Sequence, residues 1–235
     1  MSMRRVVEPE LLDTLAPDDP RAIRSRADLR RINRLMGTQS LLGNSLDRML
    51  TGSGPMRLVE LGAGDGTLLL RLARRRARHW PKITLGLLDL QPVVGKETLA
   101  GYRALGWRVE VIHADVFDWL AQPQVEAAPI VLANLFVHHF HGLRLQALLT
   151  GIADRARAFL CLEPRRSQLA LLGSHLLGVI GCNDVTRHDA VTSVRAGFSA
   201  QELSAQWPDS NTWNLQESAA GLFTHRLHAV RIPTR

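Results

Sequence analysis

Short apolar runs alternate with longer amphipathic stretches along most of the chain after Pro55. The runs have the length of buried strands, and the stretches between them carry apolar side chains at helical spacing. This alternation predicts parallel strands joined by crossover helices, and therefore an open, doubly wound α/β sheet. The predicted strands are 57–61, 83–88, 108–113, 130–134 and 158–163, with helices at about 66–79, 93–105 and 142–157.

The last two apolar runs follow a different pattern. Residues 213–217 and 223–232 are separated by too short a link for a helical crossover, so these two strands must pair antiparallel. We therefore predict a mainly parallel sheet of seven strands that ends in an antiparallel hairpin.

The first 54 residues form a helical preface. Residues 1 to about 19 have weak periodicity and are interpreted as an arm. Asp19 as N-cap and Pro20 in the first turn begin a helix that Gly37 ends, and a second helical stretch covers 40–50. The glycine-rich loop at 51–55 then divides the chain into an N-terminal arm with helices, 1–54, and a main domain, 55–235.

The net charge of +7 raises the question of a nucleic-acid partner. All of the 29 basic residues except Lys82 and Lys96 are arginines, and they are scattered along the chain. The densest cluster, 71–78, has its leucines on another helical face, which is typical of a solvated helix. We expect no nucleic acid among the partners.

The same composition indicates the compartment. No apolar run approaches the ~20 residues of a membrane span, and acids follow the basic start where a secretion signal would be apolar. Cys161 and Cys182 are too few for a disulfide framework. We predict a cytoplasmic protein without a membrane span, and the sequence leaves a homodimer open.

A glycine-rich segment after the first predicted strand carries the main chemical signal. Gly62, Gly64 and Gly66 form a G-x-G-x-G turn between strand and helix. Glycines there allow unusual dihedral angles and let a ligand approach the backbone closely. The second and third strands end in Asp89 and Asp115, and a carboxylate at Asp89 can accept both hydroxyls of a ribose. All these residues lie at the sheet edge where open α/β folds bind ligands.

The glycine spacing narrows the class of ligand. Nicotinamide and flavin binders use G-x-G-x-x-G, and nucleoside triphosphatases of the P-loop kind use G-x-x-x-x-G-K-[ST]. The chain contains neither pattern at this turn. A nucleotide-like ligand of another kind is therefore expected.

Four segments resemble, in order and spacing, the motifs of class I S-adenosylmethionine-dependent methyltransferases: VELGAGDGT, LLDL, HADVFDW and LANLFVHHF. The resemblance implies a Rossmann-like fold and S-adenosyl-L-methionine as cofactor. It implies that Glu60 lies below the glycine turn and that Asn134 and Leu135 lie beside the ligand. The remaining cofactor residues it implies are the turn residues Gly62, Ala63, Gly64 and Gly66, the ribose site at Asp89 and Leu90, and the adenine border at Asp115 and Val116.

The first candidate region on the acceptor side follows the fourth predicted strand. His138, His139 and His141 lie close to the expected ligand edge, where a histidine can take the proton of an alcohol or phenol. Equally, one of them caps the next helix and another packs inside. A magnesium site needs clustered acids, which are absent after this strand, so we expect no metal.

The second candidate region follows the fifth strand. A helix with leucines at 169, 172, 176 and 177 either packs on the sheet or walls an apolar acceptor pocket. The polar segment 183–195 is interpreted as a solvated loop or as an active-site loop. His188 and Asp189 could act as base and orienter, although adjacent residues rarely point the same way. The candidate catalytic residues are His138, His139 and His188, and the candidate substrate-binding residues are His175, Arg187 and Arg195.

The segments LRRINRLMG and GCNDVTRHDAV, with SVRAGFS after it, resemble small methyltransferases encoded beside bacterial type III polyketide synthases. That resemblance implies O-methylation of a small phenolic or lipid-like aromatic hydroxyl in secondary metabolism. An RNA or protein methyltransferase is the first alternative, but the fourth motif lacks the [DN]-P-P-[YF] pattern. A non-catalytic cofactor-binding protein is the second, and the intact glycine turn and Asp89 argue against it.

Overall fold

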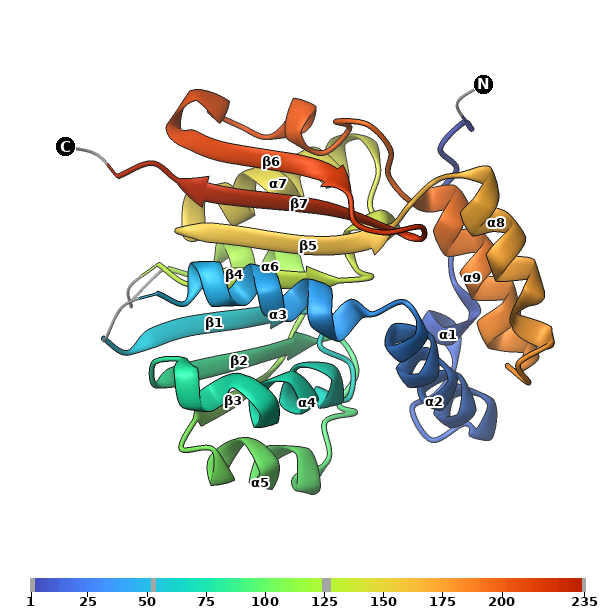
Figure 1. The fold of residues 1–235 in the computed structure, drawn as a ribbon, viewed down its shortest axis with the longest axis horizontal. Coiled ribbons are helices and arrows are strands. Elements are labelled where there is room, and N and C mark those ends of the chain that lie inside the picture. Colours follow the sequence, from blue (N-terminus) through green and yellow to red (C-terminus); the bar gives the residue numbers. More distant parts are fainter. Residues whose placement is uncertain (1–2, 52–53, 124–127, 234–235) are drawn as a thin grey trace.

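A single sheet of seven strands runs through the computed structural model, which describes residues 3–51, 54–123 and 128–233. The strand order is β3-β2-β1-β4-β5-β7-β6 (Figure 1). The first five strands are parallel, and β7 pairs antiparallel with both β5 and β6. The predicted sheet and its terminal hairpin are confirmed. The strands are β1 Met56–Leu61, β2 Ile83–Asp89, β3 Arg108–His113, β4 Ile130–Asn134, β5 Ala158–Pro164, β6 Trp213–Ala219 and β7 Thr224–Arg231.

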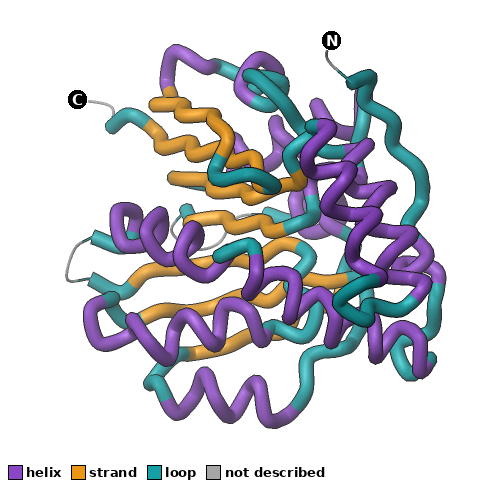
Figure 2. Tube along the Cα trace, turned by 45° about the vertical axis from the view of Figure 1, so that its right-hand side comes forward, coloured by secondary structure: helices purple, strands orange, loops and turns teal. Residues whose placement is uncertain are grey.

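Helices cover both faces of the sheet (Figures 1 and 2). Successive side chains of a strand point to opposite faces, so Leu58 of β1 packs with the helices on one side while Val59 and Leu61 pack on the other. The first face is covered by α3 Thr38–Met49, α4 Thr67–Arg76 and α5 Lys96–Ala104. The second is covered by α6 Val116–Ala121 and α7 Gly142–Arg155.

Four further helices gather beyond the carboxyl ends of the parallel strands, on the right of Figure 1. They are α1 Leu11–Thr14, α2 Pro20–Leu35, α8 Gln168–His175 and α9 Asp184–Ala196. The caps of α2 are as predicted, because the Asp19 side chain accepts from Arg21 N and Gly37 follows the helix with φ +67°. The N-terminal helices α1 and α2 both contact α9. The domain division at residue 54 stays a prediction, and residues 52–53 of the predicted loop lie outside the described residues.

Two local expectations are corrected. Residues 183–195 do not form a loop: Asn183 caps α9 by accepting from Thr186 N at 2.9 Å, and the helix buries Val185 and Val194. Two polar residues of this segment, Thr186 and Asp189, are buried and not solvated. Thr186 contacts Ser25 of α2, and Asp189 contacts Leu11 of the N-terminal arm. The short helix α6, which Asp115 caps, was not predicted.

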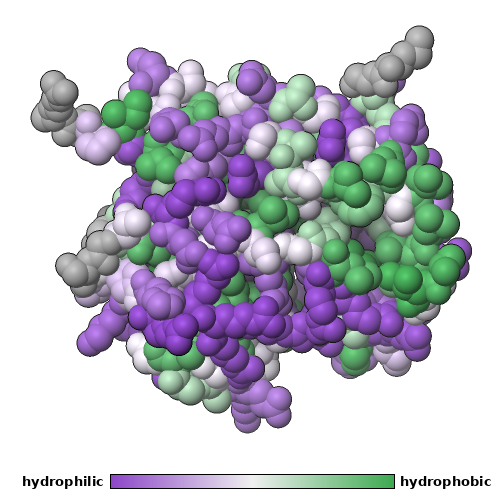
Figure 3. Space-filling view, viewed as in Figure 1, coloured by the Kyte–Doolittle hydropathy of each residue, from purple (hydrophilic) through white to green (hydrophobic). Residues whose placement is uncertain are grey.

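An apolar surface lies over α8 and the 3-10 turn that follows it, at residues 176–178. Figure 3 shows hydrophobic residues gathered on this side of the molecule, and Leu169, Leu172, Leu176 and Val179 are exposed there. Of the two alternatives for this row of leucines, packing on the sheet is wrong, because α8 buries Ala170 and Ser174 instead. Leu177, in contrast, lines an apolar cavity, as the other alternative expects. None of the described helices is long and apolar enough to cross a membrane.

Candidate active site

The glycine turn after β1 requires the conformations that only glycine adopts easily. Gly62, Gly64 and Gly66 have φ values of +63°, +54° and +67°, and Ala63 N donates to Leu88 O at 3.1 Å. A Cβ on Gly62 would lie 2.5 Å from the ring of Phe136, whereas a Cβ on Gly64 would meet nothing within 4 Å. Gly62 thus allows close packing, and Gly64 leaves open space beside the backbone.

Acidic side chains order this turn. Asp89 Oδ2 accepts from Gly64 N at 2.8 Å, and its Oδ1 accepts from Gln91 N at 2.8 Å. Asp65 accepts from Thr67 N, at the first residue of α4, at 3.0 Å. The same carboxylate pairs with Arg30 of α2 at 2.7 Å, which ties the N-terminal helices to the turn.

Glu60 lies under the turn with 3% of its surface exposed. Its Oε2 is buried and has no hydrogen-bond partner among the described residues. Burial raises the pKa of this carboxyl to about 8, and the nearby charges of Asp65 and Asp89 add to the effect. An unsatisfied buried oxygen among three acids, beside an open glycine backbone, fits a ligand that brings hydrogen-bond donors and positive charge. The amino group and sulfonium of S-adenosylmethionine would meet that requirement.

The other predicted cofactor residues lie at the same edge of the sheet. Asp115 caps α6, and Leu90 is exposed beside the end of β2. Val116 is buried in the core, 4% exposed, so little of its side chain reaches a ligand. Asn134 ends β4, and Leu135 follows it with φ +55°, a strained conformation for a branched residue. These cofactor roles stay predictions.

A mainly apolar cavity of about 230 Å³ lies between the N-terminal arm, α2, α8 and α9. Its apolar lining includes Leu29 and Ile32 of α2, Leu177 and Phe223. Leu135 also lines it, so the cavity adjoins the edge that carries the glycine turn. Its polar lining residues are Glu10, Ser25, Ser174, Thr186, Asp189 and Ser193.

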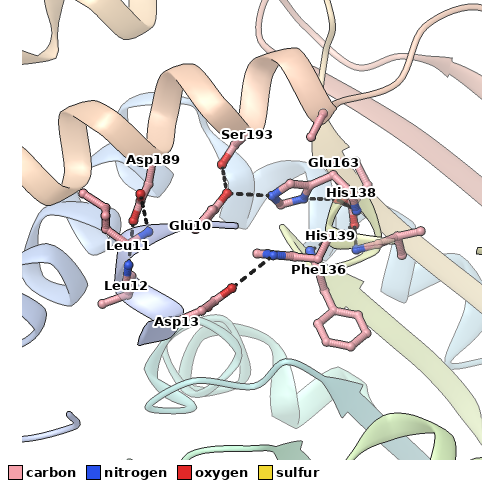
Figure 4. Close-up of polar contacts among 12 residues, drawn as sticks. Glu10, Leu11, Leu12, Asp13, Phe136, His138, His139, Glu163, Asp189 and Ser193 are labelled. Atoms are coloured by element: carbon pink, nitrogen blue, oxygen red, sulfur yellow. Dashed lines mark hydrogen bonds and ion pairs between the residues drawn. The ribbon is translucent and has the colours of Figure 1, made fainter. Parts of the chain in front are cut away.

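A chain of charged groups lies beside this cavity (Figure 4). His138 is 2% exposed, and its Nδ1 lies 2.7 Å from Glu163 Oε2 while its Nε2 lies 3.1 Å from Glu10 Oε1. Glu163 is fully buried and accepts from the backbone N–H groups of residues 136–138. Ionised carboxylates only accept, so both ring nitrogens of His138 are satisfied when both carry protons.

The electrostatics agree with a charged His138. Burial by itself lowers the pKa of the ring, but the hydrogen bonds and charges of Glu10 and Glu163 overcome this and raise it to about 9. Burial likewise opposes ionisation of Glu10, yet the hydrogen bond and charge of His138 hold the Glu10 pKa below its usual value. The ring is therefore a cation at neutral pH and already bonded on both sides, which makes it a poor base.

Of the other predicted acceptor-side residues, His139 lies beside His138, with the two ring centroids 4.3 Å apart. His139 Nδ1 lies 3.3 Å from Asp13 Oδ2 at the surface. His188 Nδ1 lies 3.0 Å from Asp189 Oδ1, so this adjacent pair does meet, but His188 is largely exposed and is not part of the cavity lining. The candidates His175, Arg187 and Arg195 are exposed and also absent from the lining. Their roles stay predictions.

Sequence reasoning missed two polar residues of the cavity, Glu10 and Ser193, and it gave Asp189 only as a possible partner of His188. Glu10 belongs to a segment that has only weak periodicity, and its place depends on contacts with distant residues. Glu10 also bears on the expectation that the site holds no metal ion, because Glu10, His138 and His139 offer ligand atoms within 4.8 Å of one another. A metal site needs acids, which are absent from the segment after β4, and the N-terminal arm supplies one of them, Glu10.

No family model matches the chain, and no curated protein sequence matches it. Solved structures do. An O-methyltransferase family protein from Burkholderia thailandensis is 19% identical with a TM-score of 0.63, over 93% of this chain and 62% of the other. The plantazolicin methyltransferase BpumL, solved with SAH, is 11% identical with a TM-score of 0.61, over 91% of both chains.

A third similar structure is RosA of Streptomyces davawensis, an N,N-8-amino-8-demethyl-D-riboflavin dimethyltransferase. It is 18% identical with a TM-score of 0.58, over 95% of this chain and 62% of the other. This chain thus spans less than two thirds of the length of the Burkholderia and Streptomyces proteins. At these identities the likeness establishes the fold, which is the Rossmann-like fold of class I methyltransferases.

Proposed function

We propose that this protein transfers the methyl group of S-adenosyl-L-methionine to a small, apolar acceptor, and that the acceptor atom is a phenolic or lipid-like aromatic hydroxyl. The observation that carries the proposal is the apolar cavity, which adjoins the glycine-turn edge through Leu135. Donor and acceptor would then meet at the carboxyl ends of β1 and β4. The O-methyltransferase family protein and the plantazolicin methyltransferase of the same fold support methyl transfer as the reaction.

The donor half of the site would be held by the acids and the turn. Glu60 would accept from the donor's amino group, the backbone at Gly64 would lie along its amino-acid portion, and Asp89 would accept its ribose hydroxyls. The donor supplies a methyl group already activated by a sulfonium. The protein therefore mainly has to align the acceptor and exclude water, since methyl transfer is an in-line displacement.

The acceptor half would select by shape and polarity. The lining is largely aliphatic, which favours burial of an aromatic ring or an alkyl chain. Among its residues are two acids, Glu10 and Asp189, and no basic side chain. A neutral hydroxyl suits this lining better than a carboxylate, which both acids would repel.

The direct test is incubation with methyl-labelled S-adenosylmethionine and a panel of alkylphenols, arylamines and benzoates, with products identified by mass. We expect label on phenolic oxygen. Label on amine nitrogen alone would retain the methyl transfer but contradict the hydroxyl acceptor. Transfer to total RNA or protein in place of the panel would contradict a small-molecule acceptor, and no donor binding by calorimetry would contradict the activity as a whole.

A further inference from the structure

The N-terminal arm is fixed across the acceptor side of the site by contacts with distant residues. Arg5 donates to Ala196 O at 2.7 Å and to Phe140 O at 2.9 Å. Further along the arm, Asp189 of α9 accepts from Leu11 N at 2.8 Å and from Leu12 N at 3.0 Å. These anchors lie on both sides of Glu10, so the position of Glu10 is determined by the fold.

Glu10 combines a fixed position with an unused oxygen. Its side chain is 12% exposed and forms part of the cavity lining. Oε1 accepts from His138 Nε2 at 3.1 Å and also from the hydroxyl of Ser193. Within the described part of the chain, Oε2 has no hydrogen-bond partner. A ligand in the cavity can therefore bond to this oxygen without breaking an existing contact.

The other polar groups of the cavity are already engaged. Asp189 accepts from two backbone N–H groups and lies within 3.0 Å of His188 Nδ1. The hydroxyl of Thr186 donates to that of Ser25 at 2.9 Å, and Ser174 donates to a backbone carbonyl. His138 lies behind Glu10, outside the lining, with both ring nitrogens bonded (Figure 4).

We propose that Glu10 binds the hydroxyl of the acceptor and takes its proton. The proton leaves as the bond to the methyl carbon forms, because only then is the O–H group acidic enough for a carboxylate whose pKa His138 holds low. The acceptor O–H bond breaks and an O–H bond forms at Glu10 Oε2. The electron pair left on the acceptor oxygen forms the bond to the methyl carbon, and the pair of the carbon–sulfur bond stays on sulfur. Glu10 afterwards gives the proton to solvent. His138 and Glu163 act behind it as positioning residues that hold the carboxylate in place. The inference rests on the proposed function, whose acceptor it specifies.

The test uses the full chain and compares Glu10→Gln with Glu8→Gln, since Glu8 lies on the same arm but is exposed. The substrates are para-substituted phenols of decreasing pKa, from an alkylphenol to 4-nitrophenol, at a pH where only the last is ionised. We expect Glu10→Gln to lower kcat on the alkylphenol about 100-fold or more, with a loss that shrinks as the phenol becomes more acidic. Glu8→Gln should match the wild type on every phenol. An equal loss on all phenols would overturn the role as base, because a merely structural defect does not depend on the acidity of the substrate.

A second measurement does not require turnover. 4-Nitrophenol bound without donor should show a raised pKa in its absorbance titration, because the charge of Glu10 repels the phenolate, and Glu10→Gln should abolish most of the shift. The residues that face Glu10, namely His138, His139 and Ser193, keep their identity in this comparison, although the variant also lowers the pKa of His138 by removing one of its two carboxylate partners. An equal shift in both proteins would overturn the proposal.

The outcomes separate this inference from the proposed function. Wild type that binds donor and methylates phenols, together with a fully active Glu10→Gln, would overturn the inference alone. Wild type that binds no donor would overturn both. Activity that is lost on dialysis against EDTA and restored by a divalent cation would assign Glu10, His138 and His139 to a metal, and would overturn a proton-accepting Glu10.

Discussion

The two halves of the site are built in different ways. On the donor side, Asp89 contacts Gly64, and Asp65 contacts Thr67, across separations of 25 and 2 positions. On the acceptor side, the bonds of Glu10 to His138 and of the arm to Asp189 join residues 128 and 178 positions apart. The half of the site proposed for the methyl donor is thus a local strand-turn-helix motif. The half proposed for the acceptor forms only when the arm, α2, α8 and α9 are assembled.

This difference predicts that the halves can be damaged separately. The donor half is supported by the core on both faces of the sheet. The acceptor half depends on a few polar anchors, and a segment with few buried contacts opens at a lower free-energy cost than the core. Variants of the anchors should therefore remove acceptor turnover while donor binding survives, and variants of the turn should do the reverse.

Asp189→Ala should have the largest effect on the acceptor half. It removes the carboxylate that accepts from Leu11 N and Leu12 N, and hydrogen bonds to a charged group contribute roughly 1.5–3 kcal/mol each. We expect turnover of phenols to fall at least about 100-fold while donor affinity by calorimetry changes less than about 2-fold. A parallel loss of donor binding would show that the halves are coupled through the arm.

The charge of His138 should make the acceptor half sensitive to pH. Because the pKa of His138 rises from 6.5 in the unfolded chain to about 9 in the fold, its stabilisation is complete below pH 6.5 and is lost as pH rises through 9. The shift corresponds to a contribution on the order of 3 kcal/mol. Urea unfolding of wild type and His138→Gln at pH 6.5 and 9.5 measures it.

The variant serves as the control, since the raised pKa of Glu60 also makes wild-type stability fall between pH 4.5 and 8. That contribution is common to both proteins and cancels in their difference. The difference in unfolding free energy should shrink on going from pH 6.5 to 9.5. A constant difference would mean that the ring is neutral in the folded protein.

The contrast also explains what the sequence could predict. Strands, crossover helices, the hairpin and the glycine turn depend on periodicity or on short motifs, so they were predicted correctly. Glu10 lies in an arm with weak periodicity, and only tertiary contacts bury it. Asp189 was a candidate orienter for His188, but its bonds to Leu11 N and Leu12 N depend on the assembled fold. The polar face of α9 looked like a loop for the same reason: its partners Ser25 and Asp28 are more than 150 residues away.

Asp89→Ala tests the donor half. It should weaken donor binding by about 1–3 kcal/mol, which is the range for lost hydrogen bonds to a charged group. The side chain also holds Gly64 N and Gln91 N, so part of the loss reflects a less ordered turn. Calorimetry with S-adenosylhomocysteine measures it. Binding of 4-nitrophenol in the absence of donor should be unchanged, and weaker nitrophenol binding would argue that the acceptor cavity depends on the turn.

Gly64→Ala should have the smallest effect on folding and the most selective effect on the donor half. Gly64 and Gly106 both have positive φ, +54° and +77°, and a Cβ meets nothing within 4 Å at either position. Both alanine variants should therefore lose about 1 kcal/mol of stability from backbone strain alone. Only Gly64→Ala places a methyl group in the space assigned to the donor, so it alone should weaken S-adenosylhomocysteine binding, by about 10-fold or more. Because the backbone strain is matched, equal affinities for S-adenosylhomocysteine in the two variants would mean that the donor does not lie against this turn. The glycine turn would then not be the donor half of the site, and the contrast with the assembled acceptor half would no longer hold.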